Sequence, residues 1–196
     1  MLIPKLVTAA ASKPVSLVEA KLHLRIDHND EDTLIDALID AATETLDGWS
    51  GLLGRCLITQ TWKIALPGFC SGRIIRLPYP DIVSDGVTIK YFDLDDVEQT
   101  YAATSFSVLE DTDGGFVWLK SGEVWPTTND RPDAVSVEFD AGYGDAAAVP
   151  APIKAAILLK LGHLYEHRED VTTGSRGASL PKGAESLVMP YRRVQF

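Results

Sequence analysis

The sequence predicts an α+β fold: a helical scaffold of two N-terminal helices and a long C-terminal helix, with an inserted antiparallel β-unit. Apolar residues recur at helical spacing near both ends of the chain, over residues 17–46 and 151–169. Between them, residues 57–139 contain short alternating runs rich in β-branched and aromatic side chains, separated by turn-forming Gly and Asp. The length of 196 residues suits one domain with an insertion.

The first helix is predicted by a capping box. Ser16 and Glu19 have the spacing at which the serine hydroxyl accepts a hydrogen bond from the third helical amide, while the glutamate reaches back to the Ser16 amide. We therefore expect a short helix over residues 17–26. The preceding residues, 1–14, have no clear period and are expected to form an extended arm that runs along a neighbour.

The other two helices are predicted by their apolar stripes and their ends. Acidic residues 30–32 suit the positive end of a helix dipole, and the strongly amphipathic run after them ends near Gly48 or Gly51. The C-terminal helix is expected from Ala151 to about Glu169. Pro152 falls in its first turn, where no amide donor is needed.

The β-unit is predicted to hold six or seven short antiparallel strands. Ser84–Gly86 is expected to form a turn, and Asp111–Gly115 a hairpin loop. The predicted strands cover residues 57–66, 73–77, 87–92, 97–101, 106–109, 116–119 and 134–139.

The sequence divides into four predicted parts. These are the arm and two helices over 1–55, the β-unit over 56–145, the core helix over 146–172, and a flexible loop with a docking tail over 173–196.

Charge is unevenly distributed along the chain. The net charge is −10, and residues 81–145 hold 3 basic and 15 acidic side chains, whereas residues 146–196 hold 7 basic and 4 acidic ones. An acidic block argues against gripping nucleic acid, because phosphate contacts need Lys and Arg. It predicts either a solvated surface or one that must not adhere to passing DNA. No apolar run approaches the ~20 residues that span a membrane, and two cysteines make no disulfide framework.

One motif raises the alternative of a zinc-dependent hydrolase. His163, Glu166 and His167 fit the H-x-x-E-H pattern, in which two histidines share a helix face and the glutamate acts as base. Such a site needs a third protein ligand and an open water position. Three acidic residues could be proposed, and no spacing recommends one: Glu169, Asp170 and Glu185. We therefore predict no catalytic, metal or cofactor site.

The last residues of the chain predict an interaction surface. Ser186–Phe196 is apolar, aromatic and basic, whereas chain ends are usually polar, and Tyr, Arg and Met are enriched in protein interfaces. We expect this tail to become ordered on a partner. The residues expected to bind are Leu187, Met189, Pro190, Tyr191, Arg192, Arg193 and Phe196.

Several motifs then occur in a recognisable order. Residues 14–27 read PVSLxEAKxHLRID and are followed by EDxLI. Residues 54–62 read GRxLxxQTW, residues 150–159 read PxxIKAAILL, and residues 180–192 read LPxGAxxLxxPYR. This order resembles the head–tail connector (adaptor) family of tailed bacteriophages and the matching protein of alphaproteobacterial gene transfer agents.

The resemblance implies a structural protein, not an enzyme. Such proteins are made in the bacterial cytoplasm and form a ring, usually of twelve copies, below the portal of a phage or phage-like particle. They extend the DNA channel, join the next connector or tail-completion protein, and clasp the portal protein with the C-terminal segment.

The ring suggests a purpose for the acidic block. Carboxylates lining a channel would repel phosphate, so that DNA passes without specific binding. The channel-lining candidates are Asp93, Asp95, Asp96, Glu98, Asp111 and Asp113. A monomeric binding module with a dispensable tail remains a further alternative.

Overall fold

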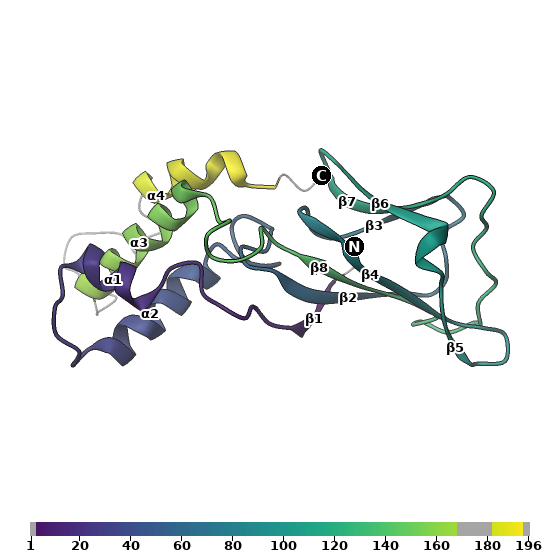
Figure 1. The fold of residues 1–196 in the computed structure, drawn as a ribbon, viewed down its shortest axis with the longest axis horizontal. Coiled ribbons are helices and arrows are strands. Elements are labelled where there is room, and N and C mark those ends of the chain that lie inside the picture. The colour runs from purple at the N-terminus through teal and green to yellow at the C-terminus, as the bar shows by residue number, and fades with distance from the viewer. Residues whose placement is uncertain (1–2, 168–181, 194–196) are drawn as a thin grey trace. The chain divides into compact units, whose positions relative to one another are not determined.

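The computed structural model describes residues 3–167 and 182–193 (Figure 1). Contacts divide these residues into a β-unit, over 3–11 and 59–142, and a helical unit, over 12–58 and 143–193. The predicted α+β class, with a β-unit inserted in the sequence between helices, is confirmed.

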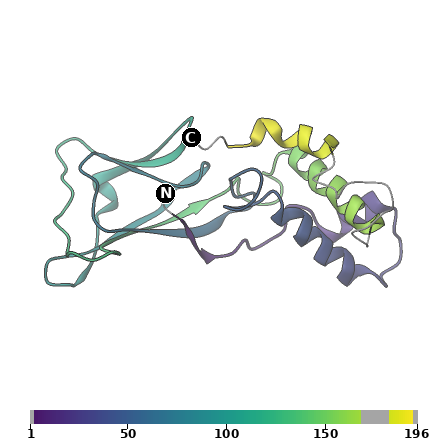
Figure 2. The same cartoon turned by 180° about the vertical axis from the view of Figure 1, so that it is seen from behind.

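The β-unit consists of two antiparallel sheets, visible from both sides in Figure 1 and Figure 2. The five-stranded sheet has the order β1 (Lys5–Thr8), β2 (Gln60–Leu66), β8 (Val135–Ala141), β4 (Ile82–Phe92) and β5 (Glu98–Thr100). The three-stranded sheet has the order β3 (Ile74–Arg76), β7 (Gly114–Leu119) and β6 (Phe106–Asp111).

The core of the β-unit follows from the alternation along its strands. Every second residue of β8 is buried, and its Phe139 and Val137 lie opposite Trp62 and Ile64 of β2. The Tyr79 ring fills the space beside them, with its centroid 5.1 Å from that of Trp62 and 6.3 Å from that of Phe139. Burial of these large side chains stabilises the pairing of the strands in this register.

Strand β4 shows that the predicted turn at Ser84–Gly86 was wrong. The strand runs through this segment without turning, and its pairing with β8 changes register between Ile82 and Val87, as at a β-bulge. A Cβ at Gly86 would lie 2.8 Å from the Cβ of Asp140 on β8. Glycine here reflects a bulge and a close approach between strands, which the sequence signal alone does not distinguish from a turn.

Two other predictions concern the ends of the β-unit. The predicted hairpin is confirmed and is tighter than expected, because Asp111 pairs with Gly114 across a two-residue turn. The N-terminal arm was grouped with the helices, but β1 pairs with β2 of the same chain, with Leu6 opposite Trp62. This eighth strand was missed because four residues beside a proline carry too short a pattern.

The predicted capping box at the start of α1 (Leu17–Leu24) is confirmed. The Ser16 amide donates to Glu19 Oε2 at 2.8 Å, and the Glu19 amide donates to Ser16 Oγ at 3.2 Å. The helix ends before the predicted Ile26, because Arg25 adopts the left-handed conformation at φ 59° and its amide turns back to the last helical carbonyls.

Helices α2 (Asp32–Glu44) and α3 (Ala151–Glu166) form the core of the helical unit. Ile35 and Ile39 of α2 are fully buried, as are Ile153 and Ile157 of α3, and the two helices pack against each other. The Tyr165 hydroxyl of α3 also donates to the Glu31 carboxylate at the start of α2. The predicted helical scaffold of N-terminal and C-terminal helices is confirmed.

Candidate functional site

The C-terminal segment is more ordered than the sequence suggested. Residues 182–193, predicted as part of a loop and tail, form helix α4 (Lys182–Val188) and a 3₁₀ turn over Met189–Tyr191. Ala184 and Val188 are fully buried, and α4 packs on α3. The helical periodicity of this short segment was obscured by Gly183 and Pro190.

The predicted portal-binding residues divide into anchored and exposed side chains. The Arg193 amide donates to the carbonyl of Leu53 at 3.0 Å, which ties the end of the segment to its own helical unit. Met189, Pro190 and Arg192 are exposed, whereas Leu187, Tyr191 and Arg193 are half-buried. Phe196 lies outside the described residues. The segment therefore presents a small surface, centred on Met189 and Arg192, from a helix that is already folded.

The six predicted channel-lining carboxylates form two groups, not one. Asp93, Asp95, Asp96 and Glu98 lie at the β4–β5 turn, after the end of β4. Asp111 and Asp113 lie at the β6–β7 turn, close to the start of β4, since the Asp81 amide donates to Glu110 next to Asp111. Strand β4 spans Ile82–Phe92, so at about 3.3 Å per residue the two groups are roughly 30 Å apart. The structure does not bring them together.

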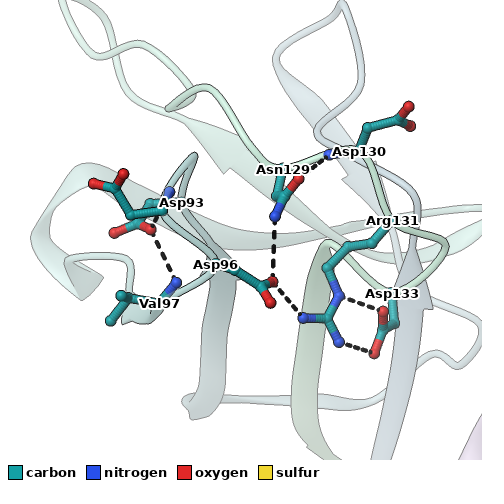
Figure 3. A network of polar contacts seen from close by, with 8 residues as sticks. Asp93, Asp96, Val97, Asn129, Asp130, Arg131 and Asp133 are labelled. Atoms are coloured by element: carbon teal, nitrogen blue, oxygen red, sulfur yellow. Dashed lines mark hydrogen bonds and ion pairs between the residues drawn. The ribbon is translucent and has the colours of Figure 1, made fainter.

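The Asp93 carboxylate accepts hydrogen bonds within the β4–β5 turn (Figure 3). Its Oδ1 accepts from the amides of Val97 and Asp95, each at 3.0 Å, and its Oδ2 accepts from Gln99 at 2.8 Å. The bond from Val97, followed by that from Gln99, lowers the pKa of Asp93 below the usual aspartate range. Asp93 is thus a turn-stabilising residue as well as a surface charge.

Arg131 joins the β4–β5 turn to the loop before β8. It donates to Asp96 at 2.8 Å and to both carboxylate oxygens of Asp133 at 2.7 and 2.9 Å, and Asn129 also donates to Asp96 (Figure 3). The guanidinium carbon lies 3.6 Å from the centroid of the Phe92 ring, a cation–π geometry. The hydrogen bond from Arg131 lowers the pKa of Asp133.

We expect Arg131→Gln to lower the midpoint of thermal unfolding at neutral pH and to have a smaller effect in acid. The pKa of Asp133 is depressed in the folded state, so its contribution is present above the ordinary value of about 3.9 and is lost as pH falls through the folded pKa. Thermal unfolding of both proteins at neutral pH and at about pH 3 checks this. Arg192→Gln, which removes an exposed guanidinium in the helical unit, is the control. An equal difference at both pH values would contradict the proposed pairing.

The β6–β7 group is paired with Arg76. The guanidinium donates to Asp111 at 2.6 Å and lies 3.9 Å from Asp113, and its carbon is 5.0 Å from the centroid of the Phe116 ring. The bond from Arg76 lowers the pKa of Asp111. The two arginines, Arg76 and Arg131, were not predicted as functional residues. A lone arginine between Asp130 and Asp133 is the sequence signal that could have identified Arg131, whereas no carboxylate adjoins Arg76 in the sequence.

Pairing reduces the field that these acids project. Glu98 is paired with Lys90 at 3.3 Å, and Asp96 with Arg131. Within the described residues, five of the six candidate carboxylates form an ion pair or a hydrogen bond, and the Asp95 carboxylate forms neither. The β4–β5 turn nevertheless keeps an excess of negative charge, because its carboxylates outnumber its two cationic partners.

The H-x-x-E-H motif lies at the end of α3. The rings of His163 and His167 stack with centroids 4.5 Å apart, and His167 follows the last helical residue, Glu166. The proposed ligands Glu169 and Asp170 lie outside the described residues. Within residues 3–167 and 182–193, no group of three His, Cys, Asp or Glu side chains is placed to hold a metal ion.

The sequence match to a known family covers the first part of the chain. Residues 14–65 match the model of the phage gp6-like head-tail connector protein family. The resemblance to head–tail connectors is confirmed. The family consists of structural phage connectors, not enzymes. No curated protein matches the chain.

Solved structures resemble the whole chain. A chain from the neck of an empty GTA particle, computed with C6 symmetry, has a TM-score of 0.78 at 23% identity and covers 99% of this chain and 97% of its own. A chain from the virion of a native gene transfer agent (GTA) particle has a TM-score of 0.77 at 24% identity, with the same coverage. The neck of the native GTA particle, computed with C12 symmetry, has a TM-score of 0.75 at 23% identity, covering 100% and 97%.

At this level of identity the likeness establishes the fold alone, over essentially the full length of the chain. Neither the zinc hydrolase nor the monomeric binding module gains support from these matches. None of the helices in the described part of the chain has the length and apolar character needed to cross a membrane.

Proposed function

We propose that this protein is a structural head–tail connector of a phage or gene-transfer-agent particle. It forms a ring below the portal, extends the DNA channel and joins the head to the next connector or tail-completion protein. The observation that carries the proposal is the agreement of two independent matches. Residues 14–65 match the connector family, and the fold of the whole chain is like that of a chain from a GTA neck. The C12 symmetry of one such neck supports a ring of twelve copies.

We assign portal binding to the exposed surface of the C-terminal segment. Met189 and Arg192 combine an apolar and a cationic side chain on a helical end that α3 and Leu53 hold in place. A surface that is already folded loses less conformational entropy on binding than a disordered tail. The predicted Phe196 lies outside the described residues.

The channel-lining role is assigned to one group of acids, at the β4–β5 turn. That turn keeps an excess of carboxylates over its cationic partners Lys90 and Arg131, and Asp95 is exposed. Negative charge along a channel disfavours binding of the phosphate backbone, so DNA would pass without being held. Asp111 and Asp113 are too far from this turn to belong to the same band of charge.

The test is the mass of the complex formed when the full-length protein is mixed with its cognate portal protein. We expect an increase equivalent to about one copy per portal subunit, because a heterologous ring closes with the symmetry of the surface on which it assembles. Native mass spectrometry or mass photometry measures it. A monomer that never associates with the portal would contradict the connector role and favour an independent binding module.

A further inference from the structure

Strand β1 is held in the β-unit by one neighbouring strand. It forms the edge of the five-stranded sheet and pairs only with β2, and all four of its residues are exposed (Figure 1). Leu6 lies directly opposite Trp62, so these two side chains adjoin, and the register changes between Leu6 and Thr8. Because the strand buries little apolar area and its ladder is irregular, its release costs little free energy.

The other face of the same strand pair carries like charges. Lys5 lies directly opposite Lys63, and both point away from the face that holds Leu6. Like charges at directly opposed positions destabilise a strand pair. Glu138 of β8 lies on the far side of Lys63, so one carboxylate adjoins two lysines. Strand β2 therefore binds β1 through backbone pairing and one apolar contact, and not through favourable charge.

A short hinge, residues 9–12, joins β1 to the helical unit. The division between the two units falls within it. Lys13, directly after the hinge, is fixed to α2 by ion pairs with Asp36 and Asp40, each at 2.8 Å. The hinge residues are exposed or half-buried, and within the described part of the chain no hydrogen bond occurs at them. Fully extended, the five steps from Thr8 to Lys13 reach about 17 Å.

These observations describe a strand that can change its partner. Strand β1 can leave β2 without breaking any other strand pair, because it pairs with no other strand. We propose that, in the assembled ring, β1 of one copy pairs with β2 of the next copy in the register seen within the single chain. The edge of β2 fits this segment, since it already binds the same residues of its own chain.

Exchange of β1 suits the geometry and the energetics of a ring. Strand β1 and the edge of β2 are two different surfaces, as a closed ring of identical subunits requires. Exchange of an identical element is a low-cost route to association, because the contacts that are broken are formed again with the neighbour. This inference rests on the proposed ring and names a contact between its subunits.

The test places two cysteines at directly opposed positions, Lys5→Cys with Lys63→Cys. Exposed Cys70 is replaced by serine and buried Cys56 is kept. Opposed Cα atoms in an antiparallel pair lie about 4.5–5.5 Å apart, within the range that a disulfide spans. We expect oxidation of the isolated chain to give a monomer with an internal disulfide. Oxidation after loading on the cognate portal should instead join neighbouring copies into covalent oligomers, seen on a non-reducing gel.

The matched control is Ala65→Cys with Ser136→Cys in the same background. These residues are directly opposed on β2 and β8, which are inner strands of the sheet and cannot exchange in this way. We expect an internal disulfide both before and after loading. Covalent oligomers from the control, as abundant as those from the 5–63 protein, would overturn the proposal.

Oxidation before loading provides a second readout. The internal 5–63 disulfide then locks β1 on its own chain, so the protein should lose most of its loading on the portal. A reducing agent should restore the loading. Full loading of the locked protein would overturn the exchange. The oxidised Ala65→Cys, Ser136→Cys protein should load normally, which separates the locking of β1 from an effect of oxidation alone.

Portal loading of the reduced 5–63 protein separates this contact from the connector role. Loading followed by internal disulfides only would reject the exchange and retain the connector role. No loading, with covalent oligomers formed by the isolated chain at high concentration, would support exchange between copies and reject the connector role. No loading, with internal disulfides at every concentration, would reject both.

Discussion

Replacement of Ile39 by aspartate is expected to unfold the helical unit. Ile39 is fully buried on α2, among apolar side chains of α2 and α3. The aspartate would be an unpaired charge in this core, or would be protonated at a comparable cost, and it would also leave a poorly filled space. Such a change costs about 5 kcal/mol, which is comparable to the whole stability of a small domain. Circular dichroism during heating should show loss of the helical transition.

The matched control for this prediction is Ala37→Asp, two residues earlier. Ala37 is exposed on the same helix, so its replacement introduces the same charge and a similar loss of helix propensity without burying a carboxylate. We expect at most about 1 kcal/mol of destabilisation. Equal unfolding midpoints for wild type and Ile39→Asp would show that this face of α2 is not the core.

The elements that sequence reasoning predicted correctly are those whose cause is local. The capping box of Ser16 and Glu19 operates within one turn of helix, and the apolar stripe around Ile35 and Ile39 follows from helix geometry. The β6–β7 hairpin follows from turn residues adjacent in sequence. In each case the interacting groups are only a few residues apart, so their spacing carries the information.

The features that could not be predicted depend on residues far apart in the chain. Gly86 signals a turn by its local sequence, but its role is set by Asp140 on the neighbouring strand. The acidic block has a large formal charge, but Arg76 pairs with Asp111 and Arg131 pairs with Asp96 across 35 positions each. No period or spacing connects such partners. Counting charges along the sequence therefore overestimates how many carboxylates are unpaired.

The candidate site in the C-terminal segment was predicted only in part, because some of its contacts also join residues far apart in the sequence. Composition identified the C-terminal segment as an interaction surface, because apolar, aromatic and basic residues are unusual at a chain end. It could not identify which side chains face inward. The burial of Val188 and the bond from the Arg193 amide to Leu53 arise only when the segment folds onto its own helical unit.

The second large effect is expected from Met189→Glu combined with Arg192→Glu, which should abolish association with the portal and leave the fold intact. Both side chains are exposed, so neither change removes a buried contact within the chain. If each anchors the portal contact, each loss is worth about 2 kcal/mol, or roughly 30-fold in affinity. In a ring the penalty recurs at every subunit, so loading should fall below detection by mass photometry.

Truncation of the C-terminal residues would be less informative than this double substitution. Deletion of residues 191–196 removes the Arg193 amide that bonds to Leu53, so loss of portal binding could then follow from loosening of α4. Met189→Leu keeps the apolar side chain and is the control that should load normally. An unchanged thermal midpoint together with absent portal loading would assign the contact to Met189 and Arg192. Normal loading of the double variant would instead place the portal contact on another surface, because negative charge at both positions is incompatible with an anchor made of one apolar and one cationic side chain.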